Sequence, residues 1–422
     1  MVMKVLVIGS GGREHAIIWK LLQNKTIEEI YCAPGNGGIS ELATCLDIQA
    51  TDVTTLVMFA KSNQIDLTIV GMDDPLMLGV VDAFEAKGLR IFGPTKNAAM
   101  LEGSKVFAKD LMKKHGIPTA GYSVFEDAEL AEKYLEACQY PLVLKADGLA
   151  LGKGVLICQT KEEALKGVQD IMVDKKFGAA GDQLVVEEFI EGPEVSVLSF
   201  CDGDHILPMI SAQDHKRAFD NDEGLNTGGM GTFSPSKFYT DEVHDFCVKN
   251  IYQKTLDAMK EEGRPFTGII FFGLMLTKDG PKVLEYNARF GDPEAQVVLP
   301  RLKTDLVDII EAAIDGRLDQ VSLEWDERAT VCVVLASGGY PVSYKKGYEI
   351  TGLEKQRSKD NVIVFHAGTK IEKEKIVTNG GRVLGLTAFG KDIEEARSVA
   401  YTAVAEVDFV DKQYRTDIGI KK

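Results

Sequence analysis

Glu285 and Asn287 stand two residues apart in a segment whose pattern predicts a β-strand. Side chains alternate between the two faces of a strand, so these two side chains point to the same side. A carboxylate and an amide oxygen on one face form half of a site for a hard cation such as Mg²⁺, and phosphates usually supply the other ligands. On its own the pattern fits a solvated strand end better than a metal site, so the rest of the chain must decide.

The elements around this pair predict a β-hairpin that carries charged groups at its end. Residues 268–277 are apolar, residues 278–281 read Lys-Asp-Gly-Pro, and residues 282–286 return as the second strand. The Asp-Gly pair supplies the positive φ that a tight turn needs. Arg289 and Asp292 follow at once, which predicts more charged side chains beside the candidate metal pair.

Lysines and glycines upstream predict a phosphate site. Lys145 ends a predicted strand over residues 141–145, and residues 146–154 read ADGLALGKG. Such a loop can close over phosphates, because glycine lets backbone N–H groups approach and lysine neutralises charge. It lacks the spacing of a Walker P-loop. Lys105 lies in the first turn of a predicted helix, where the dipole disfavours a cation; a bound anion or simple exposure would explain it.

The N-terminal segment predicts a second anion site. An apolar run over residues 2–8 leads into the glycine loop at residues 9–12 and then into a helix, which directs backbone N–H groups at an anion. Glu14 stands where a dinucleotide fingerprint needs glycine or alanine, so we expect a phosphate or small metabolite; a tight turn without a ligand is the alternative. Alternating strands and helices over about 100 residues predict a doubly wound parallel domain with ligands at its strand ends.

Two further segments carry polar groups. The strand predicted over residues 185–190, with the carboxylates that follow, can read an adenine edge and ribose hydroxyls, or it is an amphipathic edge strand. Residues 213–232 are rich in glycine and polar side chains, which is typical of a substrate loop or a simple surface loop. We expect His215 in this segment to be a structural hydrogen-bonding group.

Length and composition exclude several classes of protein. A chain of 422 residues with net charge −16 predicts several packed units and lacks the basic excess that a nucleic-acid or anionic-membrane partner requires. Seven scattered cysteines without a Cys-x-x-Cys pair indicate a reducing compartment and no zinc site. The N-terminus lacks the pattern of a signal peptide, and the apolar runs are short of bilayer length. We therefore expect a cytoplasmic protein.

Taken together, the motifs resemble the glycinamide ribonucleotide synthetase family of the ATP-grasp superfamily over essentially the full chain. The resemblance rests on GSGGREH at 9–15, PGN at 34–36, LEGSK at 101–105, KADGLALGKG at 145–154, QDHKR at 213–217, NTGGMG at 226–231 and RFGDPE at 289–294. The last three in this order are specific for the family.

The resemblance implies an α/β and α+β multidomain fold. An N-terminal doubly wound parallel α/β domain would span residues 1–103. A central ATP-grasp domain would span residues 104–325, with a mobile lid subdomain over about residues 119–192. A small C-terminal α+β domain would span residues 326–422.

The resemblance also implies roles for individual residues. The phosphates of ATP would contact lysines and a glycine loop, namely Lys105, Lys145, Gly152, Lys153 and Gly154. The adenine and ribose of ATP would contact Glu187, Glu188, Phe189, Ile190 and Glu194. Glu285 and Asn287 would bind Mg²⁺, with Mn²⁺ as an alternative. Catalytic groups facing the substrates would be Arg289, Asp292 and Asp214. Further substrate contacts would come from Gly11, Gly12, Arg13, Asp73, Gly229 and Met230.

The activity implied is the ATP-dependent joining of glycine to 5-phosphoribosylamine through glycyl phosphate, in purine biosynthesis. We expect no nucleic-acid or membrane partner and a monomer, with a weak dimer as the alternative. Two departures from the family pattern bear on the site: Asp73 is one methylene shorter than the usual glutamate, and Leu151 replaces a loop alanine. Leu225, where proline is common, should matter little. The strand before Glu285 is apolar, so we expect one pair of protein ligands.

Other functions remain as alternatives at this point. A nicotinamide dehydrogenase rests on the glycine loop alone, and Glu14 argues against it. A non-catalytic nucleotide-binding module is disfavoured by the intact lysines and the Glu285/Asn287 pair. A related ligase of purine synthesis is the nearest competitor, and the motifs QDHKR and RFGDPE favour the glycine ligase.

Overall fold

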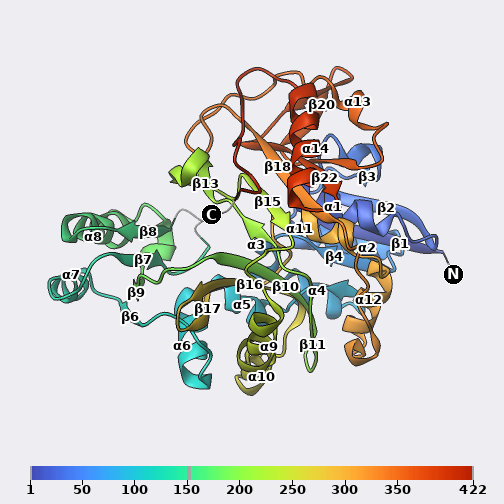
Figure 1. Cartoon of the computed structure of the whole chain (residues 1–422). Coiled ribbons are helices and arrows are strands. Elements are labelled where there is room, and N and C mark those ends of the chain that lie inside the picture. Colours follow the sequence, from blue (N-terminus) through green and yellow to red (C-terminus); the bar gives the residue numbers. More distant parts are fainter. Residues whose placement is uncertain (1, 150–153, 421–422) are drawn as a thin grey trace.

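The computed structural model describes residues 2–149 and 154–420 (Figure 1). Its N-terminal sheet is wholly parallel, in the order β3-β2-β1-β4-β5. The strands are β1 (Met3–Gly9), β2 (Ile27–Pro34), β3 (Thr44–Cys45), β4 (Leu67–Val70) and β5 (Ile91–Phe92). The helices that alternate with them are α1 (Gly12–Leu21), α2 (Val53–Ser62), α3 (Asp73–Met77), α4 (Val80–Glu85) and α5 (Lys96–Gly103). The doubly wound domain predicted from the sequence is confirmed.

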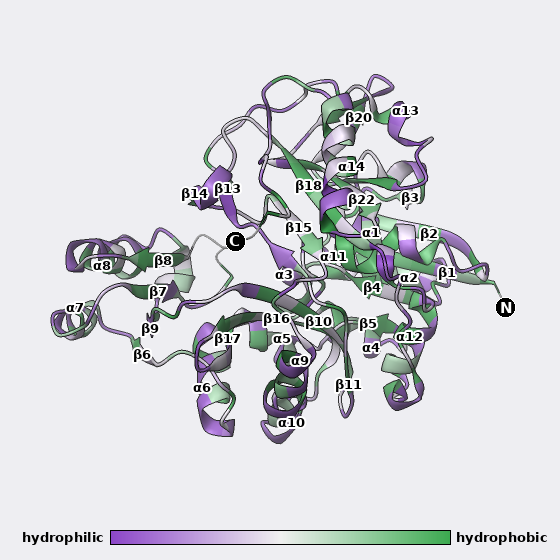
Figure 2. Cartoon of the chain, viewed as in Figure 1, coloured by the Kyte–Doolittle hydropathy of each residue, from purple (hydrophilic) through white to green (hydrophobic). Residues whose placement is uncertain are grey.

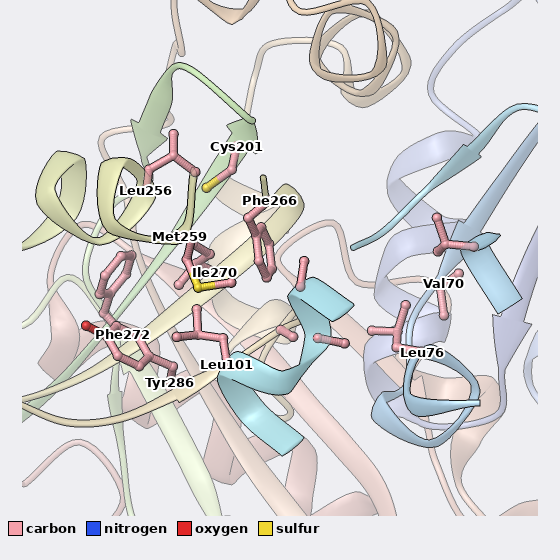
Figure 3. Packing of buried hydrophobic residues seen from close by; sticks show 14 of the residues in the cluster. Val70, Leu76, Leu101, Cys201, Leu256, Met259, Phe266, Ile270, Phe272 and Tyr286 are labelled. Carbon is pink, nitrogen blue, oxygen red and sulfur yellow. The ribbon is translucent and has the colours of Figure 1, made fainter. Parts of the chain in front are cut away.

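A second, antiparallel sheet carries the hairpin that the sequence predicted. Its order is β11-β10-β16-β17, formed by β10 (Glu194–Asp202), β11 (Ile206–Pro208), β16 (Thr267–Thr277) and β17 (Gly280–Asn287). Helices α6 (Lys105–His115), α9 (Asp241–Cys247) and α10 (Gln253–Glu261) accompany it. Figure 3 shows Phe266, Ile270 and Phe272 packed with Met259 of α10 and Leu101 of α5, so this core continues into the N-terminal domain.

A smaller sheet forms the projecting part at the left of Figure 1. Its order is β6-β9-β7-β8, from β6 (Tyr122–Phe125), β7 (Leu142–Ala146), β8 (Val155–Cys158) and β9 (Leu184–Glu188), with α7 (Ala128–Leu135) and α8 (Lys161–Val168). It has its own buried cluster, which includes Leu144, Leu184 and Val186. This part corresponds to the predicted lid subdomain, and its mobility stays a prediction.

The third large sheet joins residues from both sides of the predicted boundary at residue 326. Its order is β12-β15-β18-β22-β19, from β12 (Gln213–Asp214), β15 (Gly231–Ser234), β18 (Ala329–Ser337), β22 (Arg382–Gly390) and β19 (Val362–His366), and β23 (Lys412–Gln413) pairs with β18. Segment 213–232 is therefore partly strand, although its polar composition predicted a loop. Pairing with β18, about 100 residues away, decides this conformation, and no local pattern announces it.

Shorter elements complete the chain. The remaining α-helices are α11 (Ala295–Val298), α12 (Leu306–Ile314), α13 (Leu353–Gln356) and α14 (Ile393–Glu406), and two small hairpins pair β13 (Arg217–Phe219) with β14 (Glu223–Asn226) and β20 (Thr369–Glu372) with β21 (Lys375–Thr378). Figure 2 shows hydrophobic residues concentrated in the inner strands and hydrophilic residues along the outer helices and loops. Over residues 2–149 and 154–420, no helix combines the length and apolar character needed to cross a membrane.

Candidate active site

A cavity of about 540 Å³ opens where the sheets meet. Its lining includes many of the residues singled out in the sequence: Arg13, Asp73, Lys105, Lys145, Gly154, Glu187, Asp214, Glu285, Asn287, Arg289 and Asp292. These residues are separated by up to about 280 positions along the chain and come from all parts of the fold. The structure therefore brings the candidate nucleotide, metal and substrate groups into one space.

Strand β17 positions the candidate metal pair. Tyr286 borders the cavity but is buried in the core, where its hydroxyl lies 3.0 Å from Thr255 Oγ1, and its partly exposed neighbours Glu285 and Asn287 line the cavity on either side of it in the strand. Glu285 lies opposite Gly273 of β16, and a Cβ at Gly273 would come within 3.1 Å of Glu285 Cγ. Glycine at this position therefore leaves room for the carboxylate side chain.

The donor set fits Mg²⁺. Asn287 Nδ2 donates to the carbonyl of Tyr286 at 2.9 Å, so the amide oxygen is the ligand that Asn287 would offer beside the Glu285 carboxylate. Hard oxygen donors from one or two side chains, completed by phosphates, are the usual way in which proteins hold this ion. Within the described residues, no cluster of three or more Asp, Glu, His or Cys side chains is placed to hold a metal unaided.

Lys216 makes ion pairs with two of the predicted ligand-binding carboxylates. Its Nζ lies 3.2 Å from Glu285 Oε1 and also contacts Glu194 Oε1. The charge of Lys216, followed by those of Lys145 and Lys105, outweighs burial and lowers the pKa of Glu285 to about 2. Glu285 is therefore ionised at neutral pH, as a cation ligand must be.

Two lysines pair with Glu187 on the side of the cavity next to the small sheet, and a third, Lys105, lines the same cavity. Lys109 Nζ lies 2.9 Å from Glu187 Oε2, and Lys145 Nζ lies 2.9 Å from Glu187 Oε1. Lys105 Nζ donates to the carbonyl of Gly148 at 2.7 Å. Burial lowers the pKa of Lys109 to about 8, although Glu187 raises it. A group of lysines with one carboxylate between them has positive charge left for an anion such as a polyphosphate.

Helix α6 begins at this cluster. Asp147 accepts hydrogen bonds from Ser104 Oγ at 3.1 Å and from Val106 N–H at 3.0 Å, so a carboxylate satisfies the first turn. The early Lys105, which the helix dipole disfavours, is thus accompanied by a local negative charge. The sequence suggested a bound anion or simple exposure as the reason for a lysine at this position. The carboxylate of Asp147 provides a further reason.

On the other side of the cavity, Arg289 lies between two acidic side chains. Its Nη2 is 2.9 Å from Glu102 Oε1 and 3.7 Å from Asp73 Oδ2. Glu102 also accepts the backbone N–H of Ala288 at 2.7 Å, which anchors the segment that carries Arg289. Although burial raises it, the pKa of Asp73 is lowered by the charges of Arg289 and Arg13.

Asp292 connects three parts of the molecule. It accepts Gln296 Nε2 at 2.8 Å, and its Oδ1 lies 3.4 Å from Arg382 Nη1 of the C-terminal sheet. Arg13 of α1 donates to the carbonyl of Phe290 at 3.1 Å. Burial would raise the pKa of Asp292, but the charges of Arg382 and Arg13 hold it below its usual range. Two guanidinium groups from opposite ends of the chain therefore face one carboxylate in the cavity.

Asp214 lies against the 226–231 loop. A Cβ at Gly229, which has φ +112°, would come within 2.8 Å of Asp214 Oδ1 and 2.5 Å of Pro293 Cδ. Burial and the charge of Glu294 raise the pKa of Asp214 well above its usual value. Gly228 contributes to the cavity lining, whereas Gly229 and the buried Met230 support the loop from behind.

The N-terminal glycine loop packs against this same region. The N–H of Gly11 donates to Glu14 Oε2 at 2.5 Å, and a Cβ at Gly12 would lie 2.5 Å from Gln296 Nε2. Glu14 is fully buried and takes the place where a dinucleotide fingerprint has a small residue. Arg13 reaches the cavity lining, whereas Gly11 and Gly12 allow the close approach of α1 to the 292–296 segment.

Several predicted nucleotide contacts lie outside the described lining of the cavity. Strand β9 ends at Glu188, so Phe189 and Ile190 follow the strand, although the sequence predicted that it reached residue 190. Glu188 is exposed and accepts the N–H of Gly121 at 3.2 Å, and Glu194 contacts Lys216. Gly152, Lys153 and the departure at Leu151 lie outside the described residues.

The cavity also contains charged side chains that the sequence reasoning passed over: Glu102, Lys109, Lys216, Glu294 and Arg382. Glu102, Lys216 and Glu294 belong to the motifs LEGSK, QDHKR and RFGDPE, so their motifs pointed to them. Lys109 stands four residues after Lys105 on α6, a spacing that puts both on one helix face. Arg382 had no local signal, because only the pairing of β18 with β22 brings it to the cavity.

Family models match three consecutive parts of the chain. Residues 3–102 match the phosphoribosylglycinamide synthetase N domain, residues 103–295 its ATP-grasp (A) domain, and residues 330–421 its C domain. The chain belongs to the phosphoribosylglycinamide synthetase family. The resemblance read from the motifs, and the fold that it implied, are thereby confirmed.

Individual relatives agree with this membership of the phosphoribosylglycinamide synthetase family. The chain is 52% identical over 419 residues to a phosphoribosylamine–glycine ligase of Halalkalibacterium halodurans, covering 99% of this chain and 97% of that relative. The crystal structure of a phosphoribosylamine–glycine ligase from Thermotoga maritima matches with a TM-score of 0.85 and 34% identity, over 99% of this chain and 100% of that chain.

A more distant solved structure shares the fold alone. The biotin carboxylase domain of a Hydrogenobacter thermophilus 2-oxoglutarate carboxylase, solved with MgADP, ADP and bicarbonate, has a TM-score of 0.75 at 18% identity. The match covers 98% of this chain and 92% of that chain. The architecture of this family is therefore shared with an enzyme whose sequence has diverged far from it.

Proposed function

We propose that the cavity joins glycine to 5-phosphoribosylamine at the expense of ATP, the reaction of a phosphoribosylamine–glycine ligase in purine biosynthesis. One observation carries the proposal. The hard-cation pair Glu285 and Asn287, the lysines next to the small sheet, and the groups around Arg289 and Asp292 line the same cavity. A ligase that activates a carboxylate needs these three sets of groups together.

The first step is activation of glycine. One carboxylate oxygen of glycine bonds to the γ-phosphorus of ATP, the bond to the bridging oxygen breaks, and ADP leaves with its electron pair. Lys105, Lys109 and Lys145 would neutralise the phosphates. Glu285 and Asn287 would hold Mg²⁺, which when bound stabilises charge on the phosphate oxygens.

The second step forms the amide. The amine nitrogen of phosphoribosylamine bonds to the carbonyl carbon of glycyl phosphate, phosphate leaves, and the nitrogen loses a proton. Arg289, Asp292 and Asp214 are proposed to face glycine and the amine, and Arg13 with Asp73 to contact the sugar phosphate. The positive charge of Arg13 and Arg382 around Asp292 supports an anionic substrate at this end of the cavity.

Water must be kept from the acyl phosphate. We propose that the small sheet over residues 119–192 closes on the cavity, with Gly152, Lys153 and Gly154 in the closing loop.

Glu187 would orient the lysines, and Glu188, Phe189, Ile190 and Glu194 stay proposed contacts to adenine and ribose. The substrate contacts predicted at Gly11, Gly12, Gly229 and Met230 also stay proposals. The boundaries at residues 103 and 325, a monomer and a cytoplasmic location also stay predictions.

The test is ADP release with Mg²⁺-ATP, glycine and freshly prepared phosphoribosylamine, with each component omitted in turn. We expect turnover only with all components, and loss of about 100-fold or more in Glu285→Ala. Lys260→Met, which removes an exposed lysine paired with Asp204 far from the lining, is the control and should keep full activity. Turnover that does not depend on glycine would contradict the proposal and favour a related ligase with another acid substrate.

A further inference from the structure

Lys216 makes an ion pair with one member of the candidate metal pair. Its Nζ is 3.2 Å from Glu285 Oε1 and touches Glu194 Oε1, and Lys216 lines the same cavity as Asn287. An ammonium within 3.2 Å of a carboxylate opposes the binding of a divalent cation to that carboxylate, because like charges repel. Lys216 and a divalent cation therefore compete for the negative charge of Glu285.

We propose that Lys216 holds Glu285 in place of the divalent cation until nucleotide binds, and then turns to the transferred phosphoryl group. The proposal rests on the proposed function, because it assigns a step within the same ligation. Glu285 is only partly buried, and the ion pair with Lys216 balances its charge and holds its side chain in position while the metal is absent.

The surroundings of Lys216 favour release over a permanent bridge. Both of its partners have proposed roles toward the ligand, Glu285 toward the metal and Glu194 toward the ribose, so nucleotide binding would engage both carboxylates. The flexible four-carbon stem of lysine lets its ammonium move while the backbone stays still. The backbone here is held firmly, since the carbonyl of Lys216 accepts both the N–H and the Oγ1–H of Thr227, at 2.8 Å each.

After release the ammonium has one chemical use in this cavity. Lys105, Lys109 and Lys145 come from α6 and β7, whereas Lys216 comes from the segment between β12 and β13, near Asp214 and Glu294. During transfer, negative charge spreads over the phosphoryl oxygens as the bond to glycine forms and the bond to ADP breaks. Lys216 would add a fourth positive charge to neutralise it, from a separate element of the fold.

The first experiment measures binding of Mn²⁺ alone to the nucleotide-free enzyme by electron paramagnetic resonance. If Lys216 occupies Glu285 about nine-tenths of the time, Lys216→Met tightens Mn²⁺ binding about tenfold. The same variant should lower kcat about 100-fold or more, the usual cost of losing one group that stabilises transition-state charge. A purely structural lysine would weaken both properties together. Unchanged or weaker Mn²⁺ binding in a folded Lys216→Met protein would overturn the proposal.

Two controls keep the result interpretable. Lys260→Met should change neither Mn²⁺ binding nor kcat. If Lys216→Met does not fold, a crystal structure of the wild-type enzyme with Mg²⁺ and a non-hydrolysable ATP analogue decides. Lys216 Nζ should then lie against the γ-phosphate, and a lysine still within hydrogen-bond distance of Glu285 would overturn the proposal. Failure of the wild type to make product would count against the proposed function alone, because the Mn²⁺ titration needs no reaction.

Discussion

The backbone N–H of His366 donates to Nδ1 of His15 at 2.8 Å, which links strand β19 of the C-terminal sheet to helix α1 near the start of the chain. The two imidazole rings lie 5.5 Å apart, and both residues are buried. Burial, with a smaller contribution from the neighbouring ring, lowers the pKa of His15 to about 3, and burial lowers that of His366 to about 4. The contact between the two ends of the fold therefore depends on neutral histidines.

Acid should weaken the fold through these two residues. Above about pH 6.5 the two histidines are neutral in both the folded and the unfolded protein, so the free energy of unfolding does not depend on them. Below this pH the histidines bind protons in the unfolded chain but not in the folded protein. The free energy of unfolding therefore falls as the pH falls toward 4. From pH 6.5 to 5 the loss through His15 is about 2 kcal/mol. Urea unfolding across this range should show it, and His15→Asn, which retains an acceptor for the His366 N–H, should make the loss smaller.

The control for this prediction is a histidine with the opposite shift. A hydrogen bond to Asp202 raises the pKa of the half-exposed His205, so this residue adds stability as pH falls. His205→Asn should therefore make the acid loss slightly larger. A His15→Asn protein with the same acid dependence as the wild type would contradict the assignment.

In the enzyme without nucleotide, the carboxylate of Glu187 should take the place of the nucleotide phosphates beside Lys109 and Lys145. Glu187→Gln leaves Lys109 and Lys145 side by side without a carboxylate, which should cost about 3 kcal/mol of stability. Phosphates would restore the lost negative charge, so Mg²⁺-ATP should raise the melting temperature more in Glu187→Gln than in the wild type. Asp182→Asn, which removes an exposed carboxylate paired with Lys175 outside the cavity lining, should behave as wild type in thermal unfolding with and without Mg²⁺-ATP. A smaller shift with ATP would instead support direct contact of Glu187 with the nucleotide.

Gly229 should be essential because there is no room for a side chain at this position, in addition to its positive φ. Gly229→Ala would put a Cβ within 2.5 Å of Pro293 and 2.8 Å of Asp214, so it should lower kcat/KM about tenfold or more by shifting the loop. Gly88 also has a positive φ, of +69°, but an added Cβ there meets nothing within 4 Å. Gly88→Ala should thus cost about 1 kcal/mol of stability and leave kcat/KM unchanged. Equal losses of kcat/KM in Gly229→Ala and Gly88→Ala would show that backbone strain, and not the lack of space at Gly229, causes the effect.

Glu102 should orient Arg289 through its charge. Glu102→Gln can still accept the N–H of Ala288 but loses the ionic contact of 2.9 Å to Arg289. We expect kcat/KM for glycine to fall about tenfold, in the range found when an orienting partner is removed. Glu311→Gln breaks a comparable pair with Arg90 away from the cavity lining and should change stability only. A change below twofold in Glu102→Gln would exclude the orienting role.

Local patterns predicted much of the fold. The apolar run before the glycine loop became β1, the Asp-Gly turn became the β16–β17 hairpin, and the helix predicted with Lys105 in its first turn became α6. These elements depend on near neighbours, whose propensities and turn chemistry are readable in the chain. Strands β12 and β15 escaped prediction, because β12 pairs with β15, and β15 pairs in turn with β18, about 100 residues further on.

The sequence by itself determined the family, the same-face pairing of Glu285 with Asn287, and the motifs around Asp214, Arg289 and Asp292, since these follow from residue order and strand alternation. Only the tertiary structure decided which charges meet. It paired Lys216 with Glu285, gave Glu187 two lysines, joined His15 to His366 and brought Arg382 to Asp292. Electrostatic contacts act through space, and the spatial neighbours of a buried charge are set by the packing of whole sheets.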